Sequence, residues 1–140
     1  MLAARRIAIL TGLAVMFGAC AAPRPELASA TRSGTAAATA HFTEDQSNRG
    51  ERTFNSACAS CHAPAEFSGR VFLINWESRS VGEFYSFIRS AMPYSSPGSL
   101  TDQQYVDVTA YILRLNEFPA GGTELPPDED AMRAISFSTR

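Results

Sequence analysis

The segment Cys58-Ala59-Ser60-Cys61-His62 carries more chemistry than any other part of the sequence, because two thiols and an imidazole lie within five residues. Thiols three residues apart on one helical turn can add across the two vinyl groups of a haem, and the adjacent imidazole can then ligate the iron. The sequence therefore predicts one haem c, attached covalently through Cys58 and Cys61, with His62 as an axial ligand.

Other interpretations of the two cysteines compete with haem attachment. A thioredoxin-like redox pair requires a strand before the CxxC motif, whereas a helix is expected here. A structural zinc site requires about four ligands, and His41 is the only imidazole besides His62. A disulfide between Cys58 and Cys61 would close only a very small loop.

Met92 is the candidate for the second axial ligand. A thioether is a soft, neutral iron ligand, and Met92 precedes Pro93 on an irregular segment that follows a predicted helix. Met1 and Met16 lie near the N-terminus and Met132 lies in an acidic C-terminal stretch, so elimination also favours Met92. The alternative role for a lone methionine is core packing.

Three helix start signals surround these residues. Capping boxes begin at Thr43, Ser80 and Thr101, each with Glu or Gln three residues later. Apolar residues at helical spacing follow the second and third boxes. We expect helices over residues 44–59, 81–92 and 102–115, the second ended by Pro93 and the third by Asn116. No segment alternates as a strand does, so the fold class is all-α.

The motif, the Met-Pro loop and the helices together resemble a class I c-type cytochrome domain. Gly50 and Phe54 precede Cys58 at steps of four residues, as in that family. Residues 92–100 and 110–113 are similar to small cytochromes and cytochrome domains associated with quinoprotein alcohol dehydrogenases. The resemblance covers about residues 43–125 and implies a small cytochrome c fold, with helices packed around one covalently bound haem.

The resemblance also implies roles for single residues. Gly50 would let the first helix cross closely over the last, with Val108 and Tyr111 as the partners of Gly50 and Phe54. Trp76 would donate its indole N–H to a haem propionate; the alternative is a core aromatic residue.

The residues that follow the motif depart from the family pattern. Ala63 stands where glycine is common in the family. The carbonyl of Pro64 is the expected acceptor for the Nδ1–H of His62, a bond that would fix the ring tautomer.

The pattern of the N-terminal residues is typical of a targeting segment. Arg5 and Arg6 precede an apolar run of 11 residues, Ile7 to Phe17, which is too short to span a bilayer. We expect residues 1–20 to be a signal peptide of the lipoprotein type, with Cys20 lipidated; ordinary cleavage nearby is the alternative. Residues 21–42 are expected to be a flexible linker, residues 43–125 the cytochrome domain and residues 126–140 a C-terminal tail.

Composition excludes several classes of function. The 140 residues suit one globular domain, and a formal charge of −2 with no basic run argues against nucleic-acid binding. A haem with both axial positions filled has no open site for a small-molecule substrate. We therefore expect an electron carrier rather than an enzyme, in the bacterial periplasm and anchored to a membrane through Cys20.

Its expected partners are redox proteins: a quinoprotein dehydrogenase, a terminal oxidase or another cytochrome. Two alternatives are a haem-based sensor or gas-binding protein with a labile sixth ligand, and the cytochrome subunit of a dehydrogenase complex.

Overall fold

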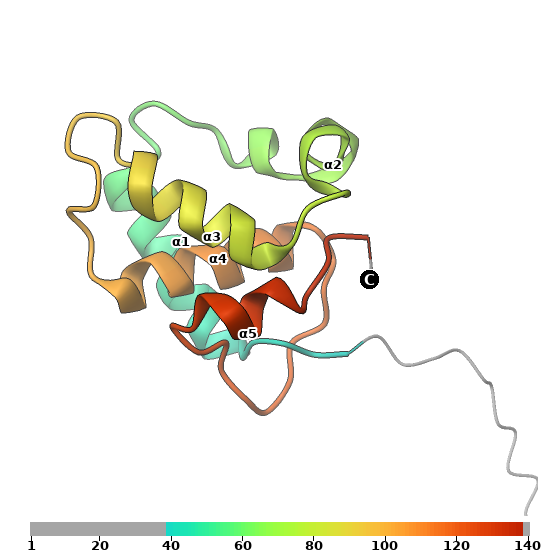
Figure 1. Cartoon of the computed structure of the whole chain (residues 1–140). Helices are drawn as coiled ribbons and strands as arrows, with labels where there is room; N and C mark the ends of the chain where they lie inside the picture. The colour runs from blue at the N-terminus through green and yellow to red at the C-terminus, as the bar shows by residue number, and fades with distance from the viewer. Residues whose placement is uncertain (1–38, 139–140) are drawn as a thin grey trace, which may run out of the picture. The chain divides into compact units, whose positions relative to one another are not determined.

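The computed structural model describes residues 39–138, and the expectations for the signal peptide, Cys20 and most of the linker lie outside that range. Within it the chain forms helices and two isolated β-bridges but no named strand, which confirms the all-α fold class. The elements, shown in Figure 1, are α1 Glu44–Ala57, the 3₁₀ helix η1 Pro64–Phe67, α2 Gly69–Trp76, α3 Val81–Ala91, α4 Asp102–Leu115 and α5 Glu129–Arg133. None of these helices is long and apolar enough to cross a membrane.

The three predicted helices begin at the predicted caps. The hydroxyl of Thr43 accepts a hydrogen bond from the backbone N–H of Gln46 at 3.1 Å, and Ser80 and Thr101 cap α3 and α4 in the same way. Such a cap contributes about 1 kcal/mol to stability. The helix α3 ends at Ala91, one residue before the expected end, whereas α1 ends at Ala57, two residues earlier than the sequence indicated. The motif therefore follows the helix rather than forming its last turn.

The helices α1 and α4 cross at Gly50, where their backbones come into contact. A Cβ atom on Gly50 would lie 1.8 Å from the carbonyl oxygen of Asp107 and 3.0 Å from the Cβ of Tyr111. One turn along α1, the rings of Phe54 and Tyr111 pack at 5.5 Å between centroids. The close crossing and the Phe54–Tyr111 contact agree with expectation. The atoms nearest to the Cβ position of Gly50 belong to the Asp107 backbone and to Tyr111.

Polar contacts reinforce this crossing on both sides. Arg49 forms two hydrogen bonds with the carboxylate of Asp107, at 3.0 and 3.1 Å. On the same pair of helices, Arg114 contacts the carboxylate of Glu51 at 2.7 Å. Because α1 leads directly into the cysteine motif, the crossing fixes the motif relative to α4.

The C-terminal segment is part of the folded unit, in contrast to the tail expected after residue 125. It forms α5, which packs along α3 (Figure 1), and Met132, Ile135 and Phe137 are buried in the core. A Cβ on Gly82 of α3 would lie 2.6 Å from the carbonyl oxygen of Glu129, which shows how closely the two helices approach.

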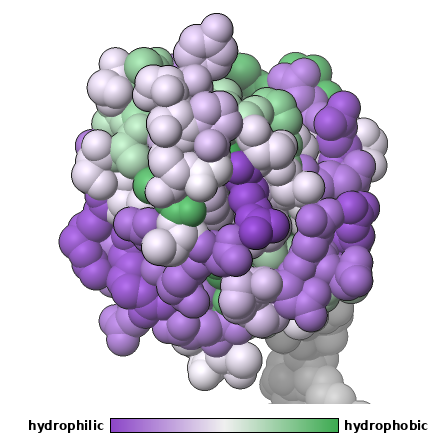
Figure 2. All heavy atoms as spheres, turned by 60° about the vertical axis from the view of Figure 1, so that its left-hand side comes forward, coloured by the Kyte–Doolittle hydropathy of each residue, from purple (hydrophilic) through white to green (hydrophobic). Residues whose placement is uncertain are grey.

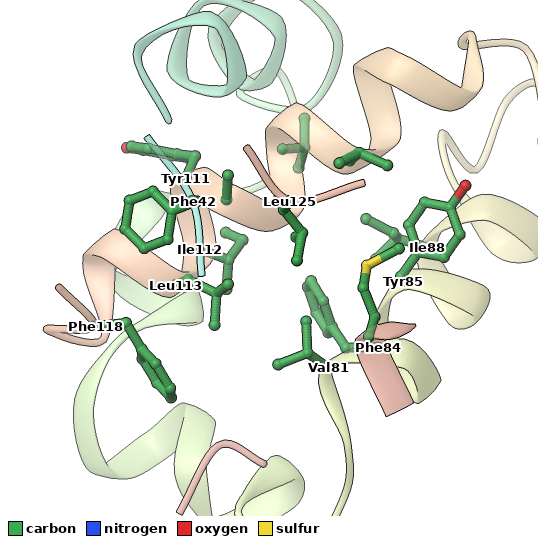
Figure 3. Packing of buried hydrophobic residues seen from close by; sticks show 14 of the residues in the cluster. Phe42, Val81, Phe84, Tyr85, Ile88, Tyr111, Ile112, Leu113, Phe118 and Leu125 are labelled. Atoms are coloured by element: carbon green, nitrogen blue, oxygen red, sulfur yellow. The ribbon is translucent and has the colours of Figure 1, made fainter. Parts of the chain in front are cut away.

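The hydrophobic core gathers side chains from both ends of the described chain. Figure 3 shows Phe42, Leu125 and residues of α3 and α4 converging on one interior. The segment before α1 is held there by a hydrogen bond from the N–H of Gly121 to the carbonyl of Phe42, at 2.7 Å. Several residues of this core, among them Phe84, Ile88 and Ile112, also line a cavity.

Candidate haem site

A cavity of about 410 Å³ lies between the cysteine motif and the loop after α3. Its volume falls in the range of about 300–1,000 Å³ that is typical of ligand and cofactor sites. All five cofactor-binding residues expected from the sequence line it: Cys58, Cys61, His62, Met92 and Trp76. The remaining wall is mainly apolar and comes from α1, η1, α3, α4 and the two loops. The main apolar residues are Phe54, Phe67, Phe84, Phe87, Ile88, Val108 and Ile112.

The cysteine motif forms a tight turn directly after α1. The backbone N–H groups of Cys61 and His62 both donate to the carbonyl of Cys58, at 3.1 and 3.0 Å. Both thiols are free; Cys58 is half-buried and Cys61 is exposed. Burial raises the pKa of the Cys58 thiol, because the apolar surroundings disfavour the thiolate.

The structure also bears on the competing interpretations of the cysteines. The CxxC motif follows a helix, not the strand of a thioredoxin-like site. In residues 39–138 no group of three or more His, Cys, Asp or Glu side chains gathers as a metal-binding cluster. The arrangement favours the interpretation in which the thiols and the imidazole face an apolar cavity and serve one bulky cofactor.

The ring of His62 is held by two neighbours from η1. Its Nδ1 lies 3.2 Å from Oε2 of Glu66, and its ring packs edge-on against Phe67 with 5.3 Å between centroids. The expected partner of Nδ1, the carbonyl of Pro64, is therefore replaced by a carboxylate. Hydrogen bonds from the backbone of Ala63 and from His62 lower the pKa of Glu66.

Met92 caps the C-terminal end of α3 and is anchored through its backbone. Its N–H donates to the carbonyl of Ile88 at 3.0 Å, and its own carbonyl accepts from the hydroxyl of Tyr105 at 2.6 Å. The N–H of Gly98 donates to the same carbonyl at 3.3 Å. These contacts close the loop after α3 and hold Met92 at the edge of the cavity.

Trp76 ends α2 and lies among aromatic side chains. Its ring stacks on Phe72 at 6.1 Å and packs edge-on against Phe84 at 5.0 Å. The guanidinium of Arg79 lies over the indole at 5.1 Å. Among residues 39–138 no hydrogen bond uses the indole N–H. The ring is thus a packing element, and its donor remains free for a cofactor group.

Two residues that the sequence analysis gave no role at the site help to build it. Glu66 contacts His62, as described above. The buried side chain of Asn116 donates to the carbonyls of Phe67 and Ile112, at 2.8 and 2.9 Å, and accepts from the N–H of Gly69 at 3.1 Å. It ties η1 and the start of α2 to the end of α4. A helix-terminating asparagine gave no sequence signal of these distant contacts.

The border of the cavity is poor in charge. Residues 56–65 and 90–101, which contain the motif and the Met92 loop, include no Arg, Asp or Glu. Figure 2 shows the side of the molecule that holds this loop. The upper part of that face is mostly intermediate to hydrophobic (white to green), and the lower part is mostly hydrophilic (purple). Tyr94 is the most exposed large side chain of this border, with 88% of its surface accessible.

These residues fit a haem attached through a CxxCH motif. The cavity supplies apolar walls for a flat organic ring, two thiols for attachment, and an imidazole and a thioether as iron ligands. Cys58 and Cys61 would hold the group, and His62 and Met92 would ligate it. When bound, a haem supplies an iron that gains and loses one electron.

Comparison with known proteins agrees with this chemistry. Residues 45–112 match the family described as cytochrome C oxidase, cbb3-type, subunit III. No curated protein and no solved structure matched the chain. The matched residues run from the start of α1 through the motif and the Met92 loop into α4, and thus include every wall of the cavity. This match supports a class I c-type cytochrome domain, a kind of domain that carries covalently bound haem and serves electron transfer.

Proposed function

We propose that the protein is a periplasmic electron carrier with one haem c, ligated by His62 and Met92. The single observation that carries the proposal is the convergence of both thiols, the imidazole and the thioether on one apolar cavity. The protein's own part is to bind the cofactor covalently, to hold both ligands in place, and to exclude water from the iron with aromatic and aliphatic side chains.

The anchoring of Met92 supports a fixed sixth ligand over a labile one. The hydroxyl of Tyr105 and the N–H of Gly98 both donate to the Met92 carbonyl, so departure of the thioether would require movement of a tethered loop. A haem-based sensor needs a sixth position that opens readily. The contacts therefore favour the carrier over the sensor.

The scarcity of charge at the border of the cavity supports transient docking of redox proteins. A dehydrogenase, such as a quinoprotein dehydrogenase, would supply electrons, and a terminal oxidase or another cytochrome would receive them. The name of the matched family, which refers to an oxidase subunit, supports an oxidase as one acceptor. It also favours one alternative function, a stable subunit of an oxidase, beside the cytochrome subunit of a dehydrogenase complex. Co-purification of a second chain in mild detergent would distinguish a subunit from a free carrier.

Absorption spectra of the purified protein, oxidised and reduced, test the cofactor and its ligation together. We expect a low-spin haem c that stays with the polypeptide on a denaturing gel. Cys58→Ala and Cys61→Ala should each leave at most one thioether bond, and His62→Ala should remove an axial ligand. Normal yields of folded, haem-free protein from all three variants would overturn the proposal.

Membrane attachment through Cys20 is a separate part of the proposal and rests on the sequence. A lipidated protein would partition into detergent, and Cys20→Ser would release it or block its processing. Several acyl chains on one cysteine give durable attachment, whereas one chain is only a marginal anchor. A soluble mature protein whose N-terminus lies after Cys20 would refute lipidation and leave the electron-carrier proposal standing.

A further inference from the structure

Both carboxylate oxygens of Glu66 contact residues at the end of the cysteine motif. Its Oε1 accepts from the backbone N–H of Ala63 at 2.8 Å, and its Oε2 lies 3.2 Å from Nδ1 of His62. The backbone N–H of Glu66 donates back to the carbonyl of Ala63 at 3.0 Å. The carboxylate therefore caps η1 and contacts the imidazole in one arrangement.

We propose that Glu66 is a positioning residue for His62, and that its carboxylate sets both the orientation of the imidazole and the electron density on it. The proposal rests on the proposed function, in which His62 ligates the iron. A carboxylate can only accept, so Nδ1 of His62 carries the proton. Nε2 is then left unprotonated, as an iron ligand must be.

Packing around η1 fixes the backbone that carries Glu66. The imidazole lies against the edge of Phe67, and the Phe67 ring packs edge-on against Phe54 of α1 at 5.6 Å. The carbonyl of Phe67 accepts from the buried amide of Asn116 in turn. The short helix that presents Glu66 is thereby fixed to both α1 and α4.

A carboxylate acceptor differs from a backbone carbonyl in its charge. Negative charge on the partner of Nδ1 increases electron donation from the imidazole to the iron and favours the ferric state. The midpoint reduction potential is lowered as a result. The side chain of Glu66 is 54% exposed, so water screens its charge, and the shift is smaller than a buried carboxylate would produce.

The test compares purified holoproteins of the wild type, Glu66→Gln, Glu66→Ala and Glu77→Gln. Glutamine keeps the length of the side chain without its negative charge, and alanine removes the acceptor altogether. Glu77 is exposed and lies just after α2, and its carboxylate has no hydrogen bond or ion pair within residues 39–138. Its variant therefore controls for the loss of one surface charge.

Two measurements are made: the midpoint reduction potential, and solvent exchange of the His62 Nδ1 proton by NMR of the reduced protein. We expect both Glu66 variants to shift to a more positive potential than Glu77→Gln. Exchange of the Nδ1 proton should be faster in Glu66→Ala than in the wild type. The absorption spectra of all four proteins should remain low-spin, because the iron ligands are unchanged.

The proposal is overturned if both Glu66 variants keep the wild-type potential, or if Glu77→Gln shifts it equally. It is also overturned if the Nδ1 proton exchanges at the wild-type rate in Glu66→Ala. These results would not contradict the proposed function as an electron carrier, because the low-spin spectra would still report the two axial ligands. A wild-type protein without low-spin, covalently bound haem would instead refute the proposed function itself.

Discussion

The hydroxyl of Tyr105 donates a hydrogen bond of 2.6 Å to the backbone carbonyl of Met92, and so ties the loop of the proposed sixth ligand to the first turn of α4. The Tyr105 side chain is buried. The bond does not touch the thioether itself. It restrains the backbone from which the thioether projects, and so would govern how readily Met92, as the proposed sixth ligand, could leave the iron.

Tyr105→Phe should weaken this restraint without creating a cavity in the core, because it removes the hydroxyl and keeps the ring. The Met92 carbonyl keeps the longer hydrogen bond from the N–H of Gly98. We therefore expect the Met92-ligated state to be destabilised by only about 1 kcal/mol, the contribution of one hydrogen bond. Denaturant titration of the ferric protein, followed by the conversion from low-spin to high-spin absorption, measures that destabilisation. Tyr94→Phe is the matched control on the same loop, because Tyr94 is exposed. Equal midpoints for the two variants would contradict the role of Tyr105.

Met92→Ala should remove the sixth ligand and leave the rest of the site in place. A neutral, soft sulfur favours ferrous iron, so its loss should lower the reduction potential. The ferric protein should become largely high-spin and bind cyanide or imidazole more readily. Folding should largely survive, because both thiols and His62 remain. A variant with the spectrum and potential of the wild type would show that Met92 is not the ligand.

Gly50→Ala should disrupt the crossing of α1 and α4. The added Cβ would meet the Asp107 backbone at 1.8 Å, and a backbone atom cannot move aside as the end of a side chain can. Overpacking of this kind costs about 1–3 kcal/mol or more, so thermal unfolding should begin at a lower temperature. Gly122→Ala is the control, because no atom lies within 4 Å of its Cβ position and its φ is not left-handed. A Gly50→Ala protein as stable as this control would contradict the close crossing.

The features that the sequence predicted correctly depend on residues close together in the chain. The caps at Thr43, Ser80 and Thr101 act within four residues, and each starts a helix as expected. The reciprocal half of the box forms at Ser80 and Thr101 but not at Thr43, because the Gln46 amide bonds the backbone of Leu125 instead. Pro93 likewise acts on its neighbour and ends α3 before Met92. The cysteine motif is local as well. Its chemistry could therefore be proposed before any tertiary contact was known.

The features that the sequence analysis missed depend on contacts between distant residues or on a very short turn. Asn116 joins α4 to η1 across 49 residues of sequence. The contact between Glu66 and His62 requires a 3₁₀ turn, for which Pro64 at the helix start and Glu66 at its third position were the available signals. The carbonyl of Pro64, which was expected to accept from Nδ1 of His62, lies nearby in the chain, but Nδ1 contacts Glu66 instead.

The acidic composition of the C-terminal segment hid its role in the core. Asp128 caps α5 by accepting from the N–H groups of Asp130 and Ala131, so these acids mark a helix start instead of a solvated tail. The apolar residues Met132, Ile135 and Phe137 are too few to show a helical period. Their burial requires the close approach of α5 to Gly82 on α3, which the local sequence does not encode.

Phe137→Ala should destabilise the whole domain if the C-terminal segment belongs to its core. The ring is fully buried, with 0% of its surface exposed, and it packs edge-on against Phe72 and Phe84 at 5.1 and 5.8 Å. Removal of a buried phenylalanine ring costs about 3–5 kcal/mol. Thermal unfolding of the holoprotein, monitored by circular dichroism, should show a clear fall in the midpoint.

Ile74→Ala is the matched control for that experiment. It also removes a large apolar side chain, but Ile74 on α2 is 71% exposed, so its loss should change stability by no more than about 0.5 kcal/mol. Phe72 and Phe84 also contact Trp76, so the gap left by Phe137 should propagate toward the cavity and loosen its α2 wall. An unfolding midpoint for Phe137→Ala equal to that of Ile74→Ala would mean that the segment after α4 does not stabilise the domain.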